Sequence, residues 1–376
     1  MIETNYEKIF AKIANIDPIK YGKTRNFLWG NVSQLSPYVA RGVISTKEIA
    51  NSLIERGFKV YQIERLLQQL TWRDYFQRTA QRFPDLSNQN VKNDPHHFKS
   101  TGISTALLQA DTGIDALDEG IEHLYETGWI HNHMRMYLSM LHTNIARCDW
   151  RSGARWMYYH LLDADMASND LSWQWVCGAN SHKQYVANQE NINKYSGSKQ
   201  VRTFLDVEYE AFSGMTIPDI LRETEALKMT PTSASVLELR ETESILFPEE
   251  IQVNDTKSVL LYSWNNLDPK WRREETHRRI LLLDSEEFER RPISLRTLEF
   301  VLALSKNIGG IEIVFGTFKD LQEKLPDHSF IYKEHPTQLG WTGTEDSRDW
   351  IFPEVSQYTS SFFGYWKKCE KYLKQF

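Results

Sequence analysis

The first half of the chain carries its apolar residues at the spacing of an α-helix. They recur three and four positions apart at 49–54, 63–70 and 121–125, which places them on one buried helix face. The segment 112–129 opens with threonine and aspartate signals and has glycine as its next-to-last residue, and these residue types commonly start and stop helices. Residues 1–205 are therefore predicted to form a helical domain.

The pattern changes after this domain. Residues 206–255 are acidic and rich in threonine, serine and glutamate, with three prolines as breakers, so we expect a linker with one or two short helices. Beyond it, short apolar runs typical of buried strands alternate with helical patterns. The runs lie at 259–262, 280–283, 311–315 and 330–332, and the helical patterns lie at about 293–307, 317–324 and 361–375.

These patterns predict a mainly α fold in three parts. A helical domain covers 1–205, an acidic linker covers 206–255, and a small α/β domain, Rossmann-like with a largely parallel sheet, covers 256–376. A chain of 376 residues with 41% hydrophobic content is long enough to bury two cores.

Composition narrows the class of protein. No apolar run is long enough to cross a bilayer, and the N-terminus lacks a signal sequence. The three cysteines lie far apart, which fits a reducing compartment and supplies no iron–sulfur cluster or metal spacing. We therefore expect a cytoplasmic monomer without a metal or a membrane partner. A net charge of -6 argues against bulk attraction to nucleic acid but leaves a local basic cleft open.

Aromatic residues are unusually frequent, with 12 Trp, 17 Tyr and 18 Phe. Many of them stand beside Asn, Arg and Asp in the first half of the chain. Large rings can serve core packing and interface area alone, or they can surround a planar cofactor with redox-active neighbours. Composition leaves both interpretations open.

Two segments combine hydroxyl, amide and aromatic residues. In the first, Tyr21–Arg25 precedes Val32–Tyr38, where serines stand before a proline. Free N–H groups and hydroxyls at a helix start suit a phosphate, and the same pattern is a common helix cap. In the second, Gln69, Trp72 and Arg73 fall on adjoining surfaces of one helix, as they would in an ordinary amphipathic helix.

A third group of segments is richer in charge. It comprises 127–136, 148–151 and 163–175. Asn132, Arg135 and Met136 share one helix face, so an amide, a cation and a thioether can reach one ligand.

Two acidic residues follow in the same group of segments. If Asp163 and Asp165 are buried they need partners, and Arg135 is the natural counter-ion for one of them. The cluster predicts either a ligand site or a structural ion-pair network.

The order of these motifs resembles the FAD-binding domain of photolyases and cryptochromes. The motifs are Ser-x-Leu-Ser-Pro-Tyr, Gln-Leu-x-Trp-Arg-Asp, Thr-Gly-Trp-Ile-His-Asn-x-x-Arg-Met, Asp-Trp-Arg, Asp-x-Asp-x-Ala-Ser-Asn and Trp-Gln-Trp. The resemblance covers about residues 20–205, roughly half of the chain. Six motifs in the same order are far more specific than any one of them.

The resemblance implies FAD as the cofactor, with the protein bending it and tuning its potential. It implies that Arg135 and Asp163 pair beside the isoalloxazine ring and that Asn169 lies near flavin N5. The cofactor-binding residues that it implies are Tyr21, Ser33, Gln34, Leu35, Ser36, Arg73, Asn132, Arg135, Asp163, Asp165 and Asn169.

The resemblance also implies an activity on damaged DNA. In a photolyase, light drives an electron from reduced flavin to a pyrimidine dimer that is flipped out of the duplex. Trp72 would stack on the lesion, and Arg25 and His133 would lie near the DNA backbone. The catalytic residues implied are Gln69, Trp72, Asn132, Met136 and Asn169.

Gln69 departs from the family pattern, because cyclobutane-dimer enzymes carry glutamate at this position. Glutamine can donate through its amide but cannot relay a proton. Asn132 and Met136, in contrast, match the cyclobutane-dimer branch. The lesion class therefore stays open between cyclobutane dimers and (6-4) lesions.

The electron-transfer residues depart as well. The family's tryptophan wire maps to Trp173 and then Trp150, but its outer position falls near His97-Phe98. The alternative route would use the aromatic residues Trp156, Tyr158 and Tyr159.

The domain order differs from the usual one, in which an α/β antenna domain comes first. The α/β segment here is either a relocated counterpart of that domain or an unrelated accessory domain. The predicted function is a photolyase-like flavoprotein that repairs pyrimidine dimers in DNA. The alternative is a cryptochrome-like blue-light photoreceptor that acts through a signalling partner.

Overall fold

The computed structural model describes residues 2–375 and divides into two compact units. The first unit combines residues up to Ile16, residues 33–81 and residues from Met229 onward, and the second combines residues 17–32 and 82–228. Both units are discontinuous in sequence, unlike the expected domains, whose boundaries stay a prediction. Among residues 2–375, no helix has the length and apolar character that crossing a membrane requires.

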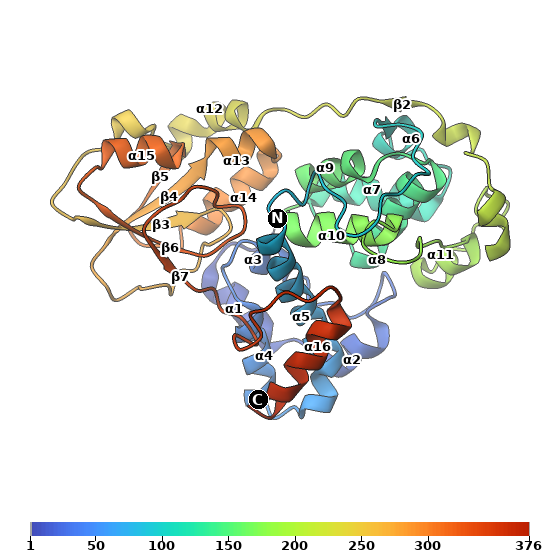
Figure 1. Cartoon of the computed structure of the whole chain (residues 1–376), viewed down its shortest axis with the longest axis horizontal. Helices are drawn as coiled ribbons and strands as arrows, with labels where there is room; N and C mark the ends of the chain where they lie inside the picture. The colour runs from blue at the N-terminus through green and yellow to red at the C-terminus, as the bar shows by residue number, and fades with distance from the viewer. Residues whose placement is uncertain (1, 376) are drawn as a thin grey trace. The chain divides into compact units, whose positions relative to one another are not determined.

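The second unit is helical (Figure 1). Its α-helices are α2 (Pro18–Thr24), α6 (Thr105–Leu108), α7 (Asp115–Thr127), α8 (Asn132–Met140), α9 (Trp150–His160), α10 (Met166–Cys177) and α11 (Gln189–Ser196). A π-helix over Leu141–Ile145 directly follows α8, and 3-10 helices lie at Tyr209–Gly214 and Asp219–Leu221. Strands β1 (Ile103–Ser104) and β2 (Thr224–Glu225) pair antiparallel. The helical character expected of this part of the chain is confirmed.

Local chemistry accounts for the helix ends that matter most for the site. α9 and α10 each begin after an aspartate, Asp149 and Asp165, whose carboxylate accepts a backbone N–H of the first turn. Such a cap satisfies a donor that the helix cannot, and its negative charge suits the positive end of the helix dipole. α7 ends at Gly128, which has φ of 71° and so adopts the left-handed conformation that glycine tolerates.

The helices of the first unit come from both ends of the chain. They are α1 (Tyr6–Ala14), α3 (Ser36–Ala40), α4 (Thr46–Glu55), α5 (Val60–Arg82) and α16 (Phe362–Cys369), with a 3-10 turn over Glu370–Gln375. α16 lies alongside α5 (Figure 1), and its buried side chains share one apolar cluster with Leu67 and Tyr75. The helical pattern at 361–375 was expected in the α/β domain, but this helix covers α5 and not the sheet.

The first unit also contains a five-stranded parallel sheet. Its strands are β3 (Ser258–Ser263), β4 (Arg278–Asp284), β5 (Ile311–Gly316), β6 (Ser329–Lys333) and β7 (Thr344–Asp346), in the order β5-β4-β3-β6-β7. Counted from the first of these strands, the order is 3-2-1-4-5, as in a Rossmann-like sheet. The four apolar runs predicted as strands are confirmed, and so is the small α/β layer.

Helices enclose this sheet. They are α12 (Thr232–Glu243), α13 (Ser285–Arg290), α14 (Leu295–Ser305) and α15 (Phe318–Lys324). β3 and β4 are buried almost throughout, as expected of parallel strands covered on both faces. The sequence missed β7 because its three residues are polar and largely exposed, so no apolar run marks it.

Candidate functional site

Most of the predicted site residues of the second unit lie on α8, on α10 and in the loop between α9 and α10. Arg135 and Asp163 form the central pair: Arg135 Nη2 lies 2.8 Å from Asp163 Oδ2 and 3.1 Å from Oδ1. Arg135 Nε also donates to the Ile130 carbonyl at 3.1 Å, which orients the guanidinium. The Asp163 side chain is 4% exposed and that of Arg135 is 23% exposed. The ion pair expected from the sequence is confirmed.

Asp165 and Asn169 lie on the first turns of α10. Asp165 is buried and its Oδ1 accepts the Ser168 N–H at 2.7 Å. Asn169 is also buried, and its Nδ2 donates to the Ala154 carbonyl at 3.0 Å and to Asp170 Oδ1 at 2.9 Å. Both N–H groups of this amide are therefore used, so Asn169 can offer a ligand only its carbonyl oxygen.

The start of α8 carries three further predicted residues. Asn132 is exposed and Met136 is half-buried. His133 Nδ1 lies 2.7 Å from the Asn26 carbonyl, and its ring lies 4.7 Å from the rings of Tyr137 and Tyr195. Burial, with a smaller effect from Arg25, lowers the pKa of His133, so this histidine is neutral at pH 7.

The structure places Tyr21 and Arg25 on α2 and at its end. Burial raises the pKa of Tyr21, so its hydroxyl stays protonated. Arg25 directly precedes Asn26, whose carbonyl contacts His133. The structure therefore brings Arg25 and His133 close together, as their shared predicted role requires.

The two predicted electron-transfer residues of the second unit are deeply buried. Trp173 is 2% exposed and packs edge-on against His142, with ring centroids 5.6 Å apart. Trp150 is 0% exposed, and its indole N–H donates to Asn90 Oδ1 at 2.9 Å. Burial keeps water away from both rings, but electron transfer through them stays a prediction.

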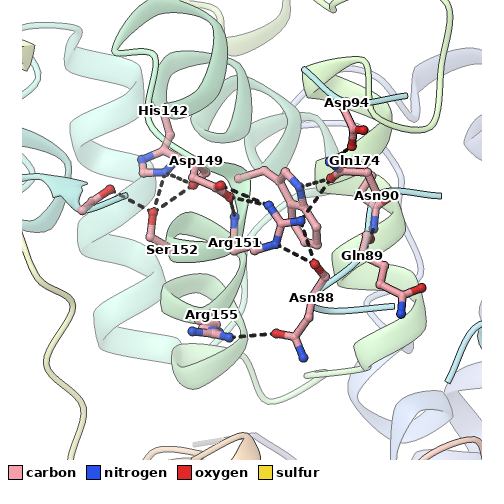
Figure 2. Close-up of polar contacts among 12 residues, drawn as sticks. Asn88, Gln89, Asn90, Asp94, His142, Asp149, Arg151, Ser152, Arg155 and Gln174 are labelled. Carbon is pink, nitrogen blue, oxygen red and sulfur yellow. Dashed lines mark hydrogen bonds and ion pairs between the residues drawn. The ribbon is translucent and has the colours of Figure 1, made fainter. Parts of the chain in front are cut away.

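A polar network that the sequence did not reveal holds the segment 88–94 against α9 and α10 (Figure 2). Arg151 forms an ion pair with Asp149 at 3.0 Å and donates to the Asn88 carbonyl at 2.8 Å. Gln174 Oε1 accepts the backbone N–H of Val91 at 2.9 Å. This network fixes Asn90, and through Asn90 it fixes the orientation of the Trp150 indole.

His142 is a second residue without a signal in the sequence. Its Nε2 lies 3.0 Å from the Asp149 carbonyl, so this nitrogen carries the proton, and its Nδ1 finds no hydrogen-bond partner among residues 2–375. Burial lowers the pKa of His142 to about 4, partly opposed by the Asp149 carbonyl. A neutral imidazole therefore lies beside Trp173 at pH 7.

The outer region of the predicted wire contains other rings. The rings of His97 and Phe98 lie 4.4 Å apart, and His97 Nδ1 lies 2.8 Å from Gln184 Nε2. On the alternative route, the Trp156 indole N–H donates to Tyr125 Oη at 3.0 Å. Neither route is distinguished by these contacts.

Gly153 on α9 makes close packing of Trp173 possible. A Cβ added at Gly153 would lie 2.4 Å from two ring atoms of Trp173 and 2.8 Å from the His142 ring. We expect Gly153→Ala to lower the free energy of unfolding by about 1–3 kcal/mol, because both buried rings must move. Gly214→Ala is the matched control, since no atom lies within 4 Å of its added Cβ. Equal denaturation midpoints for the two variants in urea would contradict this packing.

The remaining predicted cofactor residues belong to the first unit. Ser33 and Gln34 precede α3, Leu35 is buried, and Ser36 is exposed. Gln34 has φ of 53°, a left-handed conformation that is uncommon for residues other than glycine and concentrates at functional sites. No side chain caps α3, so the helix-cap alternative for these serines does not hold.

Gln69, Trp72 and Arg73 all lie on α5, as expected. Gln69 is half-buried, and Arg73 Nη2 lies 3.4 Å from the Val39 carbonyl. The Trp72 ring stacks on Phe362 of α16, with centroids 3.8 Å apart and planes 11° apart. One face of the ring predicted to stack on a lesion is therefore covered by the chain's own C-terminal helix.

The residues present fit the polar groups of a flavin nucleotide. The second unit offers a fixed cation in Arg135, a fixed carbonyl acceptor in Asn169 and a buried carboxylate in Asp165. His131 Nε2 is buried without a hydrogen-bond partner among the described residues, and burial lowers the pKa of His131 to about 4. No group of three His, Cys, Asp or Glu side chains within residues 2–375 is placed to hold a metal.

Residues 66–205 match the family described as the FAD binding domain of DNA photolyase. The chain is 29% identical over 147 residues to a deoxyribodipyrimidine photo-lyase of Alkalihalophilus pseudofirmus, covering 38% of this chain and 31% of the relative. It is 32% identical over 173 residues to that of Synechococcus, covering 43% and 35%. It is 27% identical over 189 residues to cryptochrome-1 of Sinapis alba, covering 47% and 38%. The chain thus spans about a third of the length of these curated relatives.

Two solved structures are also similar. A bacterial class III photolyase from Agrobacterium tumefaciens has a TM-score of 0.46 and 25% identity, covering 51% of this chain and 43% of that chain. A Synechocystis cryptochrome has a TM-score of 0.46 and 21% identity, covering 52% and 44%. By the match of residues 66–205, this part of the chain belongs to the photolyase and cryptochrome family, as its FAD-binding domain.

Proposed function

We propose that the chain is a photolyase-like flavoprotein that binds FAD and uses light to repair pyrimidine dimers in DNA. The buried pair of Arg135 and Asp163, in the segment that matches the photolyase FAD-binding domain, is the observation that carries this proposal. A buried carboxylate that holds an arginine in one orientation is costly unless the pair is used or fully satisfied. The relatives named as deoxyribodipyrimidine photo-lyases support the same function.

The residues of the second unit would each have a distinct task toward the cofactor. Arg135 stays charged and oriented because Asp163 and the Ile130 carbonyl hold it. Asn169 accepts a hydrogen bond from an N–H of the ligand, since both of its own N–H groups are engaged. Reduced FAD, when bound, supplies the light-driven electron that splits a dimer, and the protein supplies binding and electrostatics.

The residues of the first unit proposed for cofactor and lesion are assigned by the resemblance. Ser33, Gln34, Leu35, Ser36 and Arg73 would hold the ribityl-phosphate region. Gln69 and Trp72 would contact the lesion, together with Asn132 and Met136 of the second unit. Arg25 and His133 would contact the DNA backbone, where a neutral histidine acts as a hydrogen-bond donor.

The experiment uses the full chain loaded with FAD and reduced without oxygen. It is mixed with an oligonucleotide carrying one cyclobutane thymine dimer, or one (6-4) lesion, and illuminated with blue light. Chromatography then measures the repaired strand, with a dark sample as the control. Repair of either lesion only in the light is expected, and it also settles the lesion class that Gln69 leaves open. A protein that cannot retain FAD contradicts the proposal at its first step.

A second candidate is a cryptochrome-like photoreceptor, favoured by the stacking of Phe362 on Trp72. A covered ring face is unavailable for a base, whereas signalling through a partner does not need it. In this case the flavin bleaches under blue light while both lesions stay intact. That outcome would contradict repair and retain the cofactor.

A further inference from the structure

A second site lies in the first unit, at the carboxyl ends of the parallel strands. The strand order reverses between β3 and β6, which are neighbours in the sheet. At such a point the chain leaves adjacent strands toward opposite faces, and a crevice remains outside their carboxyl ends. Asn265 and Asn266 follow β3 and His335 follows β6 at this point.

This crevice is closed on its other side by the helical part of the same unit. The backbone N–H of Leu267 donates to the Arg41 carbonyl at 2.8 Å. A Cβ at Gly42 would lie only 2.7 Å from the Asn265 carbonyl, so glycine permits this approach. A pocket of about 50 Å³ remains, several times the roughly 10–15 Å³ that one water needs.

Asn266 places an unsatisfied donor in this pocket. The residue is 5% exposed, lines the pocket, and its Nδ2 has no hydrogen-bond partner among residues 2–375. Asn265 beside it is satisfied, since its Nδ2 donates to Thr337 Oγ1 at 3.3 Å. A buried donor without an acceptor is costly, which indicates an acceptor that binds from solution.

The charges around the pocket favour an anionic acceptor. The cationic side chains that line it are Arg73, Lys333 and Arg348, and the acidic ones are Glu334 and Asp349. Both carboxylates already have donors: Glu334 accepts from the Trp350 indole and the Arg348 backbone, and Asp349 lies 3.5 Å from Lys333. Arg348 Nη1 donates to the neutral Gln77 amide at 2.7 Å, so this contact leaves its charge uncompensated.

The start of α4 adds to this field. Ser45 and Thr46 line the pocket, and they stand at the cap and first position of this ten-residue helix. The amino-terminal end of a helix carries partial positive charge and favours anions. The helix end, the arginines and the Asn266 amide thus all favour the same ligand charge.

We propose that this pocket binds a small oxyanion, either a phosphate or a carboxylate group of a small molecule. The Asn266 Nδ2 donates to the anion, while Arg73 and Arg348 neutralise it. This site is separate from the family's FAD-binding segment and does not rest on the proposed function.

Equilibrium dialysis of the full chain with radiolabelled inorganic phosphate, and separately with labelled acetate, tests the proposal. Asn266→Asp keeps the side-chain size and replaces the donor by a repelling charge. We expect it to weaken anion binding by about tenfold or more, since a hydrogen bond to a charged group contributes roughly this much. Asn51→Asp, on the exposed surface of α4, adds the same charge elsewhere and should leave the affinity unchanged.

Asn266→Ala removes the donor without adding charge and covers the case in which Asn266→Asp does not fold. Stronger binding of phosphate than of acetate identifies a phosphate group, and the reverse identifies a carboxylate. The proposal fails if the wild-type chain binds neither anion, or if Asn266→Asp and Asn266→Ala bind as tightly as Asn51→Asp. Flavin absorbance measured on the same samples reports cofactor binding independently.

Discussion

Arg135→Met is expected to lower the free energy of unfolding by about 3 kcal/mol, because it leaves the buried Asp163 carboxylate without its counter-ion. Methionine keeps much of the apolar stem of arginine, so lost packing contributes little. The same variant should retain less FAD, since a fixed cation of the proposed site is gone. Urea denaturation and the flavin absorbance of the purified protein measure the two effects separately.

The matched control is Arg222→Met in the same unit. Arg222 pairs with Asp219, but the two side chains are 62% and 89% exposed, and exposed pairs of this kind contribute about 0–1 kcal/mol. The double variant Arg135→Met with Asp163→Asn removes both charges and should recover part of the lost stability. If Arg135→Met costs no more than Arg222→Met, the pair is not the structural centre that we infer.

Phe362→Ala is expected to lower the free energy of unfolding by about 3–5 kcal/mol, the usual loss for a phenylalanine removed from a core. Phe362 is 3% exposed, stacks on Trp72 and meets Tyr75 edge-on at 6.0 Å. Its removal leaves a cavity between α5 and α16 and frees one face of the Trp72 ring. Urea denaturation measures the stability, and acrylamide quenching of tryptophan fluorescence measures the exposure.

Phe363 provides the control because it is the next residue and is 73% exposed. Phe363→Ala should change the free energy of unfolding by no more than about 0.5 kcal/mol. Similar losses in the two variants would show that α16 is not anchored on Trp72. If Phe362→Ala still folds, repair assays on it test whether the covered ring face limits access of a lesion to Trp72.

The sequence alone determined the local elements. Apolar residues at helical spacing marked α4, α5 and α7, and runs such as Val259–Tyr262 marked four of the five strands. Such patterns are readable because they record which face of each element is buried. The same local logic predicted the pair of Arg135 and Asp163, since a buried carboxylate needs a cation and few cations stand near it in the sequence.

The resemblance to a family added roles that local physics does not supply. FAD, Asn169 near its ring and the electron-transfer tryptophans came from the order of six motifs. The structure adds that the Asn169 amide is oriented by Ala154 and Asp170. That orientation depends on a backbone carbonyl of another helix, which no side-chain pattern records.

Only the tertiary structure decided which distant segments meet. Phe362 covers Trp72, Asn90 orients Trp150, and Asn266 faces a pocket completed by α4 and α5. These contacts join residues far apart in the chain, and their geometry follows from how whole elements pack. Local spacing carries no information on that packing, because the same apolar face can pack against any complementary one. The sequence therefore determined the elements and their chemistry, and the packing of those elements decided which side chains became neighbours.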